Sequence, residues 1–373
     1  MNVLLLDQFS ELGGAQRCLL DLLPALAGPG WSAHVAAPGD GELAARAIAL
    51  NATADRIPCG PYASGYKTPC DVARFAVQTP RLAREIRSLI RRYDADLVYV
   101  NGPRLAPAAA LAVRKGPPVL FHAHSLLDGY PLRLAGWSLR LTRAAVVASC
   151  RFVARPLAPY AGQSRIRVVY NGVRQNGSPR RDTSGNTSTV RIGVIGRISP
   201  EKGQAEFLRA VRLLYPHLPH GQFLICGGPL FSSASALRYG AELEALAKDL
   251  PVEFTGWQQN IDSVLSTLDL LVVPSASVDA TPRVILEAFA AGVPVIAFAS
   301  GGIPEIVEHN VTGFLVEQRS HEALAGAMRH WLLREPERLR EASACARLKA
   351  GSEFSLERYR QQMLEAMQSA VKS

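Results

Sequence analysis

Residues 272–298 read VVPSASVDATPRVILEAFAAGVPVIAF, and this stretch decides the fold class. An apolar run of the β type is followed by a loop, by a segment with helical spacing and by a second apolar run. Thr281 suits the N-cap of that helix, Pro282 its first position and Gly292 its end. The stretch therefore predicts a strand, a helix and a second parallel strand, the unit from which helix-covered parallel sheets are built.

The same alternation of apolar runs and helical segments continues on both sides of this stretch. In the first half, the predicted buried strands are VLLLD from Val3, AHVAAP from Ala33, DLVYV from Asp96, PVLFH from Pro118, AAVVAS from Ala144 and IRVVY from Ile166. In the second half they are VRIGVIG, QFLICG, PVEFTG, LDLLVVPS, PVIAFAS and the shorter GFLV. We therefore expect an α/β protein of two Rossmann-like, doubly wound domains, for which 373 residues are enough.

One interruption of this rhythm sets the domain boundaries. Residues 174–189, RQNGSPRRDTSGNTST, have no hydrophobic periodicity and are rich in Ser, Gly, Asn and Arg, as linkers are. We expect an N-terminal domain at residues 1–173, a C-terminal domain at residues 190–350 and a terminal helix at residues 351–373.

Composition narrows the class of protein. The net charge of +9 suits an anionic partner, such as a phosphate-bearing substrate, a nucleic acid or a membrane surface. The six cysteines form no C-x-x-C pair, and no H-E-x-x-H or G-x-S-x-G motif is present, so we expect no metal site. No charged leader and no apolar run of about 18 residues is seen, so we expect a cytoplasmic protein without a membrane-spanning helix.

Ligands of doubly wound sheets bind beyond the carboxyl ends of the strands, so the loops at those ends hold the candidate site residues. The loop after RIGVIG carries Arg197 and Lys202, on either side of a predicted helix start at Ser199 and Pro200. The free N–H groups and dipole of a helix N-terminus favour an anion, so the two cations can bind one diphosphate there. A surface Arg and Lys near a helix start are equally common without such a role.

The loop after LDLLVVPS carries Asp279, and Glu287 follows eight residues later inside the predicted helix. A loop carboxylate at this position can accept hydrogen bonds from a sugar. The carboxylate of Glu287 can accept hydrogen bonds from the paired hydroxyls of a ribose. The alternative is an ordinary helix residue, although the apolar neighbours of Glu287 indicate partial burial, and a buried carboxylate needs partners.

Two further loops follow strands of the first half. Gly13 and Gly14 come after VLLLDQFSEL and let a ligand approach the backbone closely, although a plain turn is an equal alternative. His122 and His124 end PVLFHAH, and strand alternation directs both to one face of the sheet. A lone histidine is more often structural, whereas two at a sheet edge favour a site.

These loops, taken together and in this order, resemble the family-four retaining glycosyltransferases of the GT-B fold, whose two Rossmann-like domains face each other across a cleft. The resemblance covers nearly the whole chain. It is densest over residues 190–316, in GRISPEKG, CGGP, FTGW and DATPRVILEAFAAGVPVIAFASGGIPEIVEHNVTGFLV. It implies transfer of a sugar from a nucleotide-diphosphate sugar to a glycan, glycolipid or small-molecule hydroxyl, with no metal cofactor.

The resemblance also implies roles for single residues. Arg197 and Lys202 match the pair that holds the donor diphosphate and stabilises its departing charge. Glu287 matches the acid that holds the donor ribose, and Asp279 stands beside the donor sugar, where the family has a glutamate. His124, rather than His122, matches the histidine that approaches the transferred sugar.

The remaining matches concern backbone. Residues 280–284, which include Thr281, Pro282, Arg283 and Val284, match a turn whose amides approach phosphate and sugar. Gly13 and Gly14 match a glycine loop near the diphosphate, and Gly227 of CGGP is placed with the donor-binding residues. Asn171 and Gly172 match the crossover between domains, and the terminal helix from Phe354 is expected to cross back to the first domain.

Three alternatives stay open at this stage. A nucleotide-sugar epimerase or sugar phosphorylase has the same architecture, and a catalytically silent nucleotide-sugar-binding subunit would agree with Asp279 in place of glutamate. A nucleic-acid binder rests on charge alone, so we expect no nucleic-acid partner.

The segment PRLAREIRSLIRRYDAD from Pro80 predicts an arginine-rich helix. Such a helix indicates either a solvated surface or a peripheral contact with the inner face of an anionic membrane, where a lipid-linked acceptor would lie.

Overall fold

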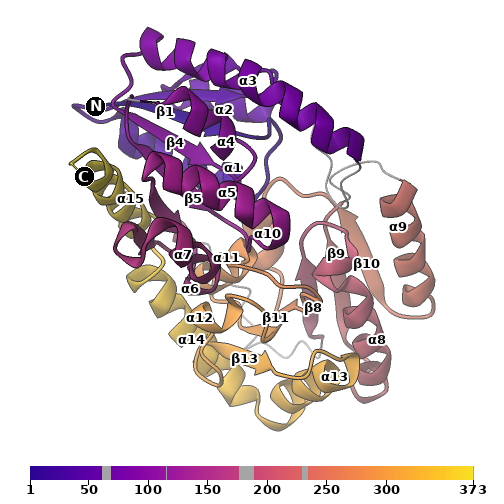
Figure 1. The fold of residues 1–373 in the computed structure, drawn as a ribbon. Coiled ribbons are helices and arrows are strands. Elements are labelled where there is room, and N and C mark those ends of the chain that lie inside the picture. The colour runs from indigo at the N-terminus through magenta and orange to yellow at the C-terminus, as the bar shows by residue number, and fades with distance from the viewer. Residues whose placement is uncertain (61–68, 115, 176–188, 229–233, 373) are drawn as a thin grey trace. The chain divides into compact units, whose positions relative to one another are not determined.

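The computed structural model describes residues 1–60, 69–114, 116–175, 189–228 and 234–372, which form two compact units (Figure 1). The first unit comprises Met1–Gly172 and Leu356–Ser373, and the second comprises Val173–Ser355. Most of the predicted linker, residues 176–188, lies outside the described residues. Each unit holds one parallel sheet, so the predicted α/β class with two doubly wound domains is confirmed.

The first unit is built on a seven-stranded sheet of order β3-β2-β1-β4-β5-β6-β7. Its strands are β1 (Asn2–Asp7), β2 (Ser32–Ala37), β3 (Thr53–Arg56), β4 (Leu97–Asn101), β5 (Val119–Ala123), β6 (Ala145–Ala148) and β7 (Ile166–Val168). From β1 the chain adds strands toward one edge and then returns to add β4 on the other side. This reversal places the topological switch point, where such sheets bind ligands, between β1 and β4.

Helices and short helical turns connect these strands. They are α1 (Gly14–Leu22), η1 (Leu23–Ala27), α2 (Glu42–Ala49), α3 (Pro69–Arg92), α4 (Ala106–Ala112), α5 (Gly129–Thr142), α6 (Arg151–Ala154), η2 (Arg155–Leu157), α7 (Ala158–Ala161) and η3 (Gln163–Arg165). Helices α3, α4 and α5 lie side by side, whereas the cluster formed by α1, α2 and the apolar residues of β1 and β2 lies on the sheet's other face (Figure 1). The apolar side chains Leu82, Ile86 and Leu89 of α3 are buried.

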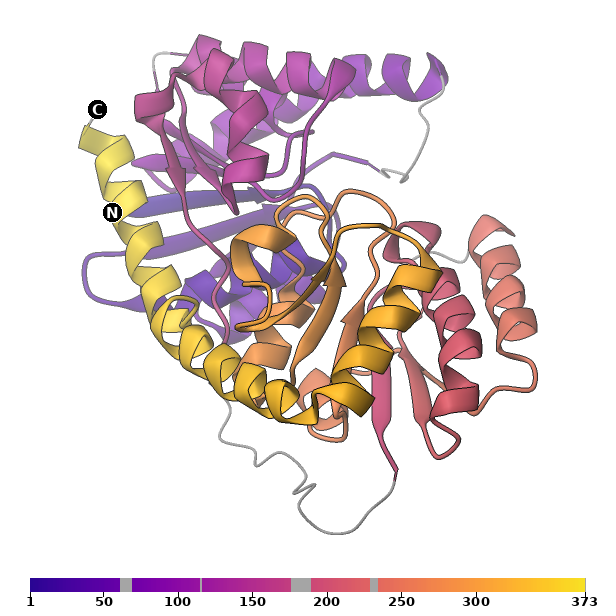
Figure 2. The same ribbon diagram turned by 90° about the horizontal axis from the view of Figure 1, so that it is seen from below.

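The last helix of the chain, α15 (Leu356–Lys372), belongs to the first unit. Its buried side chains, including Tyr359, Met363 and Met367, join the hydrophobic cluster formed by α1 and the sheet. The Tyr359 hydroxyl donates to the carbonyl of Cys18 at 3.0 Å, and the Arg360 guanidinium donates to that of Asp21 at 2.7 Å. Figure 2 shows this helix, in yellow, running beside the strands of the first unit.

The second unit has a six-stranded parallel sheet of order β10-β9-β8-β11-β12-β13. Its strands are β8 (Arg191–Ile195), β9 (Gln222–Cys226), β10 (Val252–Gly256), β11 (Leu270–Val273), β12 (Val295–Phe298) and β13 (Gly313–Val316). The order reverses between β8 and β11, so the second switch point lies there. The loops that the sequence singled out, after RIGVIG and after LDLLVVPS, are the loops at this switch point.

Helices and short helical turns connect the strands of the second unit, and several of them pack one large hydrophobic cluster against the sheet. They are η4 (Pro200–Lys202), α8 (Gln204–Leu214), η5 (Tyr215–His217), α9 (Ala234–Ala247), α10 (Ile261–Leu265), α11 (Arg283–Ala291), α12 (Ile303–Ile306), α13 (His321–Arg329), the π-helical turn η6 (His330–Arg334) and α14 (Pro336–Ser352). The cluster contains Phe207, Phe298 and Trp331, all fully buried.

Two predicted helix starts are wrong, one by four residues and the other by one. Residues 200–202 form only a single 3-10 turn, and α8 begins at Gln204 because Gly203 takes a left-handed conformation with φ of 73° between them. Helix α11 begins at Arg283, so Pro282 rather than Thr281 is its N-cap, without a capping side-chain hydrogen bond. The predicted helix end is confirmed, since Gly292 forms the left-handed C-cap with φ of 69°.

Candidate active-site residues

The switch point of the second unit brings Lys202 and Asp279 together. The Lys202 ammonium donates to the Asp279 carboxylate with an Nζ–Oδ2 distance of 2.5 Å. The Ser275 hydroxyl, just past β11, donates to the same carboxylate oxygen at 3.1 Å. Two loops that are 77 residues apart in sequence therefore meet at the carboxyl ends of β8 and β11.

Two glycines permit this meeting because they approach the backbone of the Asp279 loop. A Cβ on Gly203 would lie 1.8 Å from the carbonyl oxygen of Pro274, and a Cβ on Gly301 would lie 1.9 Å from that of Asp279. Both glycines have positive φ, at 73° and 58°. The amide of Gly302 also donates to the Asp279 carbonyl at 2.9 Å, which fixes the loop.

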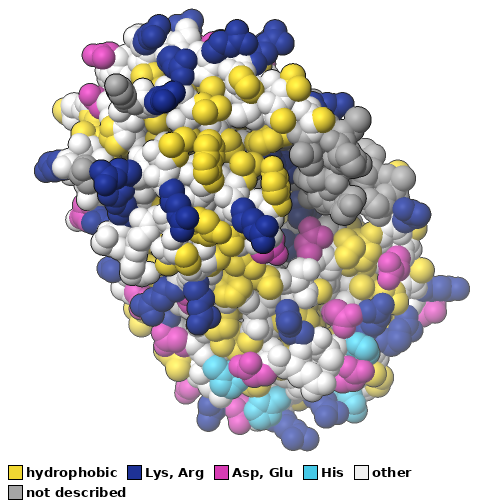
Figure 3. Space-filling view, viewed as in Figure 1, with side chains coloured by type: hydrophobic (Ala, Val, Ile, Leu, Met, Phe, Trp, Pro, Cys, Tyr) yellow, Lys and Arg dark blue, Asp and Glu magenta, His cyan; other side chains and the backbone are white. Residues whose placement is uncertain are grey.

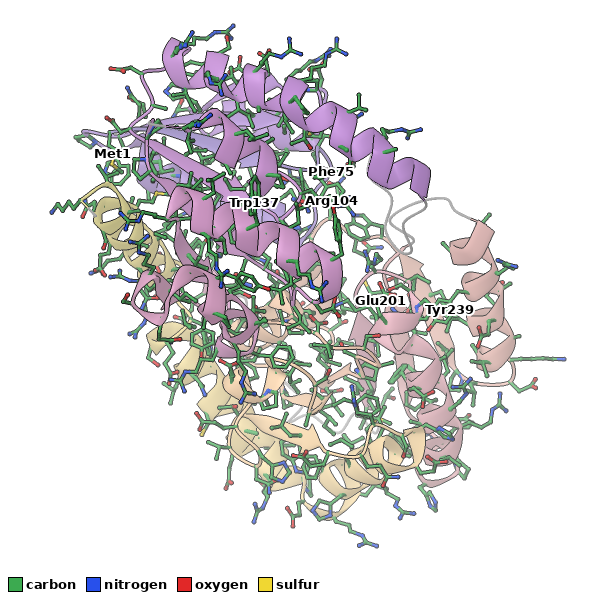
Figure 4. All side chains as sticks on the ribbon, viewed as in Figure 1. Met1, Phe75, Arg104, Trp137, Glu201 and Tyr239 are labelled. Atoms are coloured by element: carbon green, nitrogen blue, oxygen red, sulfur yellow. The ribbon has the colours of Figure 1, made fainter. Side chains whose placement is uncertain are left out.

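Arg197 lies on the same turn as Lys202 but forms an ion pair with Glu201. Its backbone carbonyl accepts a hydrogen bond from the Gln204 side chain at 2.8 Å. The amide of Ala205 donates to the Tyr239 hydroxyl at 3.3 Å, which ties the start of α8 to α9 (Figure 4). Each predicted diphosphate-binding cation is thus paired with a carboxylate at this edge of the sheet.

The predicted turn after Asp279 leads into α11. Thr281 and Pro282 are buried, and Val284 is partly buried. Arg283 and Glu287 face each other one helical turn apart, with an Nε–Oε1 distance of 3.6 Å and with both side chains more than four-fifths buried. The partial burial expected for Glu287 is thus observed, and its carboxylate lies beside a cation of the same helix.

Gly227 lies on the neighbouring loop after β9, where its amide donates to the carbonyl of Gly256 at 2.9 Å. The amide of Ile198 donates to the carbonyl of Gly228 at 3.0 Å, so the loop with Arg197 and the CGGP loop are joined through their backbones. Pro229 of the same motif lies outside the described residues.

In the first unit, the glycine loop follows β1 as predicted. Gly13 is the N-cap of α1, and its amide donates to the Gln16 side-chain oxygen at 3.1 Å. The amide nitrogen of Gln16 in turn donates to the buried carboxylate of Asp7 at 2.8 Å. The loop is therefore held by side chains as well as by its own helix.

The histidine pair lies at the carboxyl end of β5. The rings of His122 and His124 are in contact, with centroids 3.8 Å apart and planes tilted by 36°, so both are on one face of the sheet as predicted. His122 is fully buried with Nδ1 2.5 Å from the Tyr99 hydroxyl, and burial lowers the pKa of its imidazole well below the usual value. His124 is only partly buried, with Nε2 2.6 Å from the side-chain oxygen of Asn101.

Several neighbours of these residues escaped the sequence analysis, which judged each loop by its own motif. Asp7 and Asn101 are polar residues at the ends of apolar strands, and this position was a usable signal. Glu201 was part of GRISPEKG but received no role, and Ser275 lacked any motif.

Two general features concern the described residues. Their histidines, cysteines and acidic residues form no group of three or more that could hold a metal ion. Within the same part of the chain, no helix combines the length and the apolar character needed to span a bilayer.

Comparison with known protein families identifies two matching family models. Residues 12–176 match the model described as glycosyltransferase family 4, and residues 180–347 match that of the group 1 glycosyl transferases. The junction between the two matches falls in the predicted linker.

Among curated proteins, the chain is 26% identical over 277 residues to the sulfoquinovosyl transferase SQD2 of Arabidopsis thaliana, covering 66% of this chain and 52% of that protein. It is 34% identical over 197 residues to the D-inositol 3-phosphate glycosyltransferase of Mycolicibacterium smegmatis, covering 49% and 44%. The chain spans about half or less of the length of the curated relatives it matches.

Among solved structures, Anabaena HepE in complex with UDP-glucose has a TM-score of 0.83 and 23% identity, covering 99% of this chain and all of that one. Sucrose-phosphate synthase of Thermosynechococcus elongatus has a TM-score of 0.80 and 20% identity, covering 99% and 98%. At these identities the likeness concerns the fold, which is the two-domain GT-B architecture.

Proposed function

Since this chain belongs to the family-four-like glycosyltransferases of the GT-B fold, we propose that it transfers a sugar from a nucleotide-diphosphate sugar to an acceptor hydroxyl with retention of the anomeric configuration. The acceptor is a glycan, a glycolipid or a small molecule, and the setting is polysaccharide or glycolipid biosynthesis. The structures of Anabaena HepE in complex with UDP and with UDP-glucose support the donor class.

One observation carries this proposal: Lys202 and Asp279 converge at the switch point of the second unit. A nucleotide-sugar transferase needs a cation that binds the diphosphate and, within a few ångströms of it, a group that accepts hydrogen bonds from the sugar hydroxyls. An ammonium 2.5 Å from a loop carboxylate supplies both at one point. A diphosphate oxygen on Lys202 would compete with Asp279 for the same ammonium and release the carboxylate toward the sugar hydroxyls.

In this proposal the chemical step depends on the leaving group. The nucleoside diphosphate gains negative charge as the glycosidic bond breaks, and Arg197 and Lys202 stabilise that charge where it develops. The acceptor hydroxyl attacks from the face of the leaving group, whose phosphate takes the proton. Glu287 holds the donor ribose, and His124 approaches the transferred sugar. No metal is assigned to the step.

Substitution of the two cations tests the proposal. Arg197→Ala and Lys202→Ala are each expected to lower turnover by on the order of 10²-fold, because each removes stabilisation of the leaving group. Arg209→Ala is the matched control, since Arg209 also pairs with a carboxylate near the start of α8 but lies on its second turn. Full turnover in both site variants, with unchanged folding by circular dichroism, contradicts the assignment.

Product analysis separates the alternatives. Incubation with a panel of nucleotide sugars and acceptors is expected to release nucleoside diphosphate and to give a glycoside with the donor's anomeric configuration, measured by NMR. A changed sugar that stays on the nucleotide would identify an epimerase. Binding of UDP without turnover of any donor would identify a silent binding subunit.

We also propose a peripheral contact with an anionic membrane through α3 of the first unit. Arg81, Arg84 and Arg91 of this helix are exposed. Arg87 and Arg92 are engaged within the protein, Arg87 with backbone carbonyls of α4 and Arg92 with Asp55 at 2.9 Å. Arg81, Arg84 and Arg91 therefore support this contact, whereas Arg87 and Arg92 already have partners in the protein.

A further inference from the structure

Three polar side chains form a row across the carboxyl edge of the first sheet. The strand register pairs Asp7 of β1 with Asn101 of β4, and Asn101 with His122 of β5. All three side chains are almost completely buried, although the strands that carry them are otherwise apolar. The row lies at the switch point between β1 and β4, where this fold binds ligands.

Two chains of hydrogen bonds end on the carboxylate of Asp7. In the first, the Gly13 amide donates to Gln16 at 3.1 Å, and Gln16 donates to Asp7 Oδ1 at 2.8 Å. In the second, Nδ2 of Asn101 donates to Asp7 Oδ2 at 2.5 Å, while Oδ1 of Asn101 lies 2.6 Å from Nε2 of His124. One carboxylate therefore accepts from Gln16 and Asn101, and through them it is linked to the glycine loop and to the histidine.

The direction of the second chain is fixed by chemistry. An ionised carboxylate only accepts hydrogen bonds, so it must face the amide nitrogen of Asn101. The amide oxygen of Asn101 then faces His124, and an oxygen there requires a proton on Nε2 of the imidazole. The Ala15 carbonyl, 3.3 Å from the same Asn101 nitrogen, favours the same orientation of the amide.

We propose that Asp7 is a positioning residue for the transfer reaction, holding both the His124 tautomer with the proton on Nε2 and the glycine loop at residues 13–14 through its two hydrogen-bonded chains. The proposal rests on the proposed function, since it takes both groups to face the substrate. Asp7 itself is not a catalytic residue, because it acts through Asn101 and Gln16.

The environment of Asp7 agrees with a role beyond stability. Burial raises the pKa of its carboxyl from 3.8 to about 6, against the opposing effect of hydrogen bonds from Asn101, Gln16 and the backbone. An ionised carboxylate in this place therefore costs the fold free energy. A neutral residue would cost less but could not accept from both chains at once.

Histidine NMR of the full chain tests the second chain of hydrogen bonds, the one that reaches His124, without any substrate. Long-range ¹H–¹⁵N spectra of ¹⁵N-histidine-labelled protein report which ring nitrogen carries the proton, and His124→Gln assigns the signal. Wild type is expected to show the proton on Nε2 of His124. Asp7→Asn and Asn101→Ala are each expected to shift His124 toward a mixture of tautomers. The control is Asp96→Asn, just before β4 at the amino end of the strands, which is expected to leave the tautomer unchanged.

Amide exchange tests the first chain, the one that reaches Gly13. The exchange rate of the Gly13 amide is expected to rise about fivefold or more in Gln16→Ala and in Asp7→Asn, which is the effect of losing about one hydrogen bond. Asn101→Ala is expected to leave that rate near the wild-type value, because it interrupts only the histidine chain. If Asp7→Asn fails to fold, the Gln16 and Asn101 variants still test the two chains separately.

Turnover of UDP-glucose connects the row to the reaction. In Asp7→Asn we expect the turnover number to fall by on the order of 10²-fold through misplacement of both groups, with KM for the donor changing less. An unchanged His124 tautomer in both Asp7→Asn and Asn101→Ala overturns the proposal, as does wild-type turnover in Asp7→Asn. If wild type transfers no sugar from any donor, the proposed function fails, while the tautomer and exchange results still decide whether Asp7 orients these groups.

Discussion

At the scale of single residues, the ion pair of Lys202 and Asp279 contributes little to stability. The two side chains are 31% and 18% exposed, and ion pairs in contact with solvent are typically worth about 0–1 kcal/mol. The ion pair of Arg197 and Glu201, whose side chains are 32% and 41% exposed, contributes equally little. Such pairs exchange partners at low cost, which suits cations that bind and release a charged ligand.

Glu287 provides a prediction about donor binding. Glu287→Gln is expected to weaken binding of UDP more than it slows turnover, because the amide replaces one acceptor oxygen by a donor and weakens the contact with Arg283. Isothermal calorimetry with UDP measures the first effect, and turnover at saturating donor measures the second. Glu244→Gln, an exposed glutamate of α9, is the control. Unchanged UDP affinity in Glu287→Gln would show that Glu287 does not bind the ribose.

Asp7 gives a prediction about pH. Its folded pKa of about 6 lies above the ordinary 3.8, so between these values the folded protein binds a proton that the unfolded chain does not. The free energy of unfolding therefore rises as pH falls through 6, by about 3 kcal/mol for the full interval. Turnover moves in the opposite direction, since the protonated carboxyl no longer accepts from both Asn101 and Gln16.

Comparison of wild type with Asp7→Asn isolates this contribution. The comparison is needed because His122, whose folded pKa is lowered, acts in the opposite sense and loses stability as pH falls. Tyr99 and Cys59 also lie near Asp7, and burial raises the pKa of both side chains, so their ionisation is confined to alkaline pH. In urea unfolding between pH 4.5 and 7.5, the free energy of unfolding of wild type minus that of Asp7→Asn is expected to rise as pH falls. A constant difference across this range contradicts a raised pKa for Asp7.

At the scale of elements, hydrophobic patterning was sufficient wherever an apolar run marks a strand, and this includes the partly exposed edge strands β7 and β10. Twelve of the predicted apolar runs correspond to strands β1, β2 and β4–β13. The missed strand, β3, reads TADR and lies at the edge of its sheet with partly exposed residues, so no apolar run marks it. Edge strands need less burial, and their sequence is correspondingly less distinctive.

Site residues were predictable where a motif or a turn residue marks them, and the contacts among them were not. The sequence pointed to Lys202 and to Asp279 separately, but their meeting depends on the pairing of β8 with β11. The row of Asp7, Asn101 and His122 likewise depends on register, which no local pattern contains. Helix starts shifted because Gly203 and Pro282 set backbone angles that only the surrounding loop determines.

The turn between η4 and α8 supplies a prediction at this scale. Gly203→Ala is expected to lower the free energy of unfolding by more than about 1 kcal/mol, since a Cβ meets the Pro274 carbonyl at a positive φ. It is also expected to displace Lys202 and so reduce turnover. Gly240→Ala is the control, because this glycine of α9 has open space around it and alanine there should stabilise by about 0.5–1 kcal/mol. Chemical denaturation with both variants measures the contrast, and equal stability would remove the steric argument.

At the scale of the whole molecule, the excess of positive charge has a candidate location on the first unit. Exposed arginines of α3 accompany exposed apolar side chains on the same helix and on α4 and α5. These are Val77 of α3, Leu111 of α4 and Tyr130, Trp137 and Leu141 of α5. Figure 3 shows apolar side chains in yellow with Lys and Arg among them over the face that α3 and α5 share, and Figure 4 labels Trp137 on that face. Aromatic and basic side chains together suit the interfacial region of an anionic bilayer.

The final prediction concerns binding to such a bilayer. The protein is expected to sediment with vesicles that contain phosphatidylserine at low salt, and to release as salt screens the arginines. The triple substitution of Arg81, Arg84 and Arg91 by Gln should weaken binding by about 3 kcal/mol, since each arginine near the surface contributes about 1 kcal/mol. The same change at Arg334, Arg338 and Arg340, exposed arginines at η6 and α14, is the control for net charge. If both triple variants bind equally, the attraction is a property of net charge alone, and if wild type ignores both anionic and neutral vesicles, a soluble acceptor is the better account.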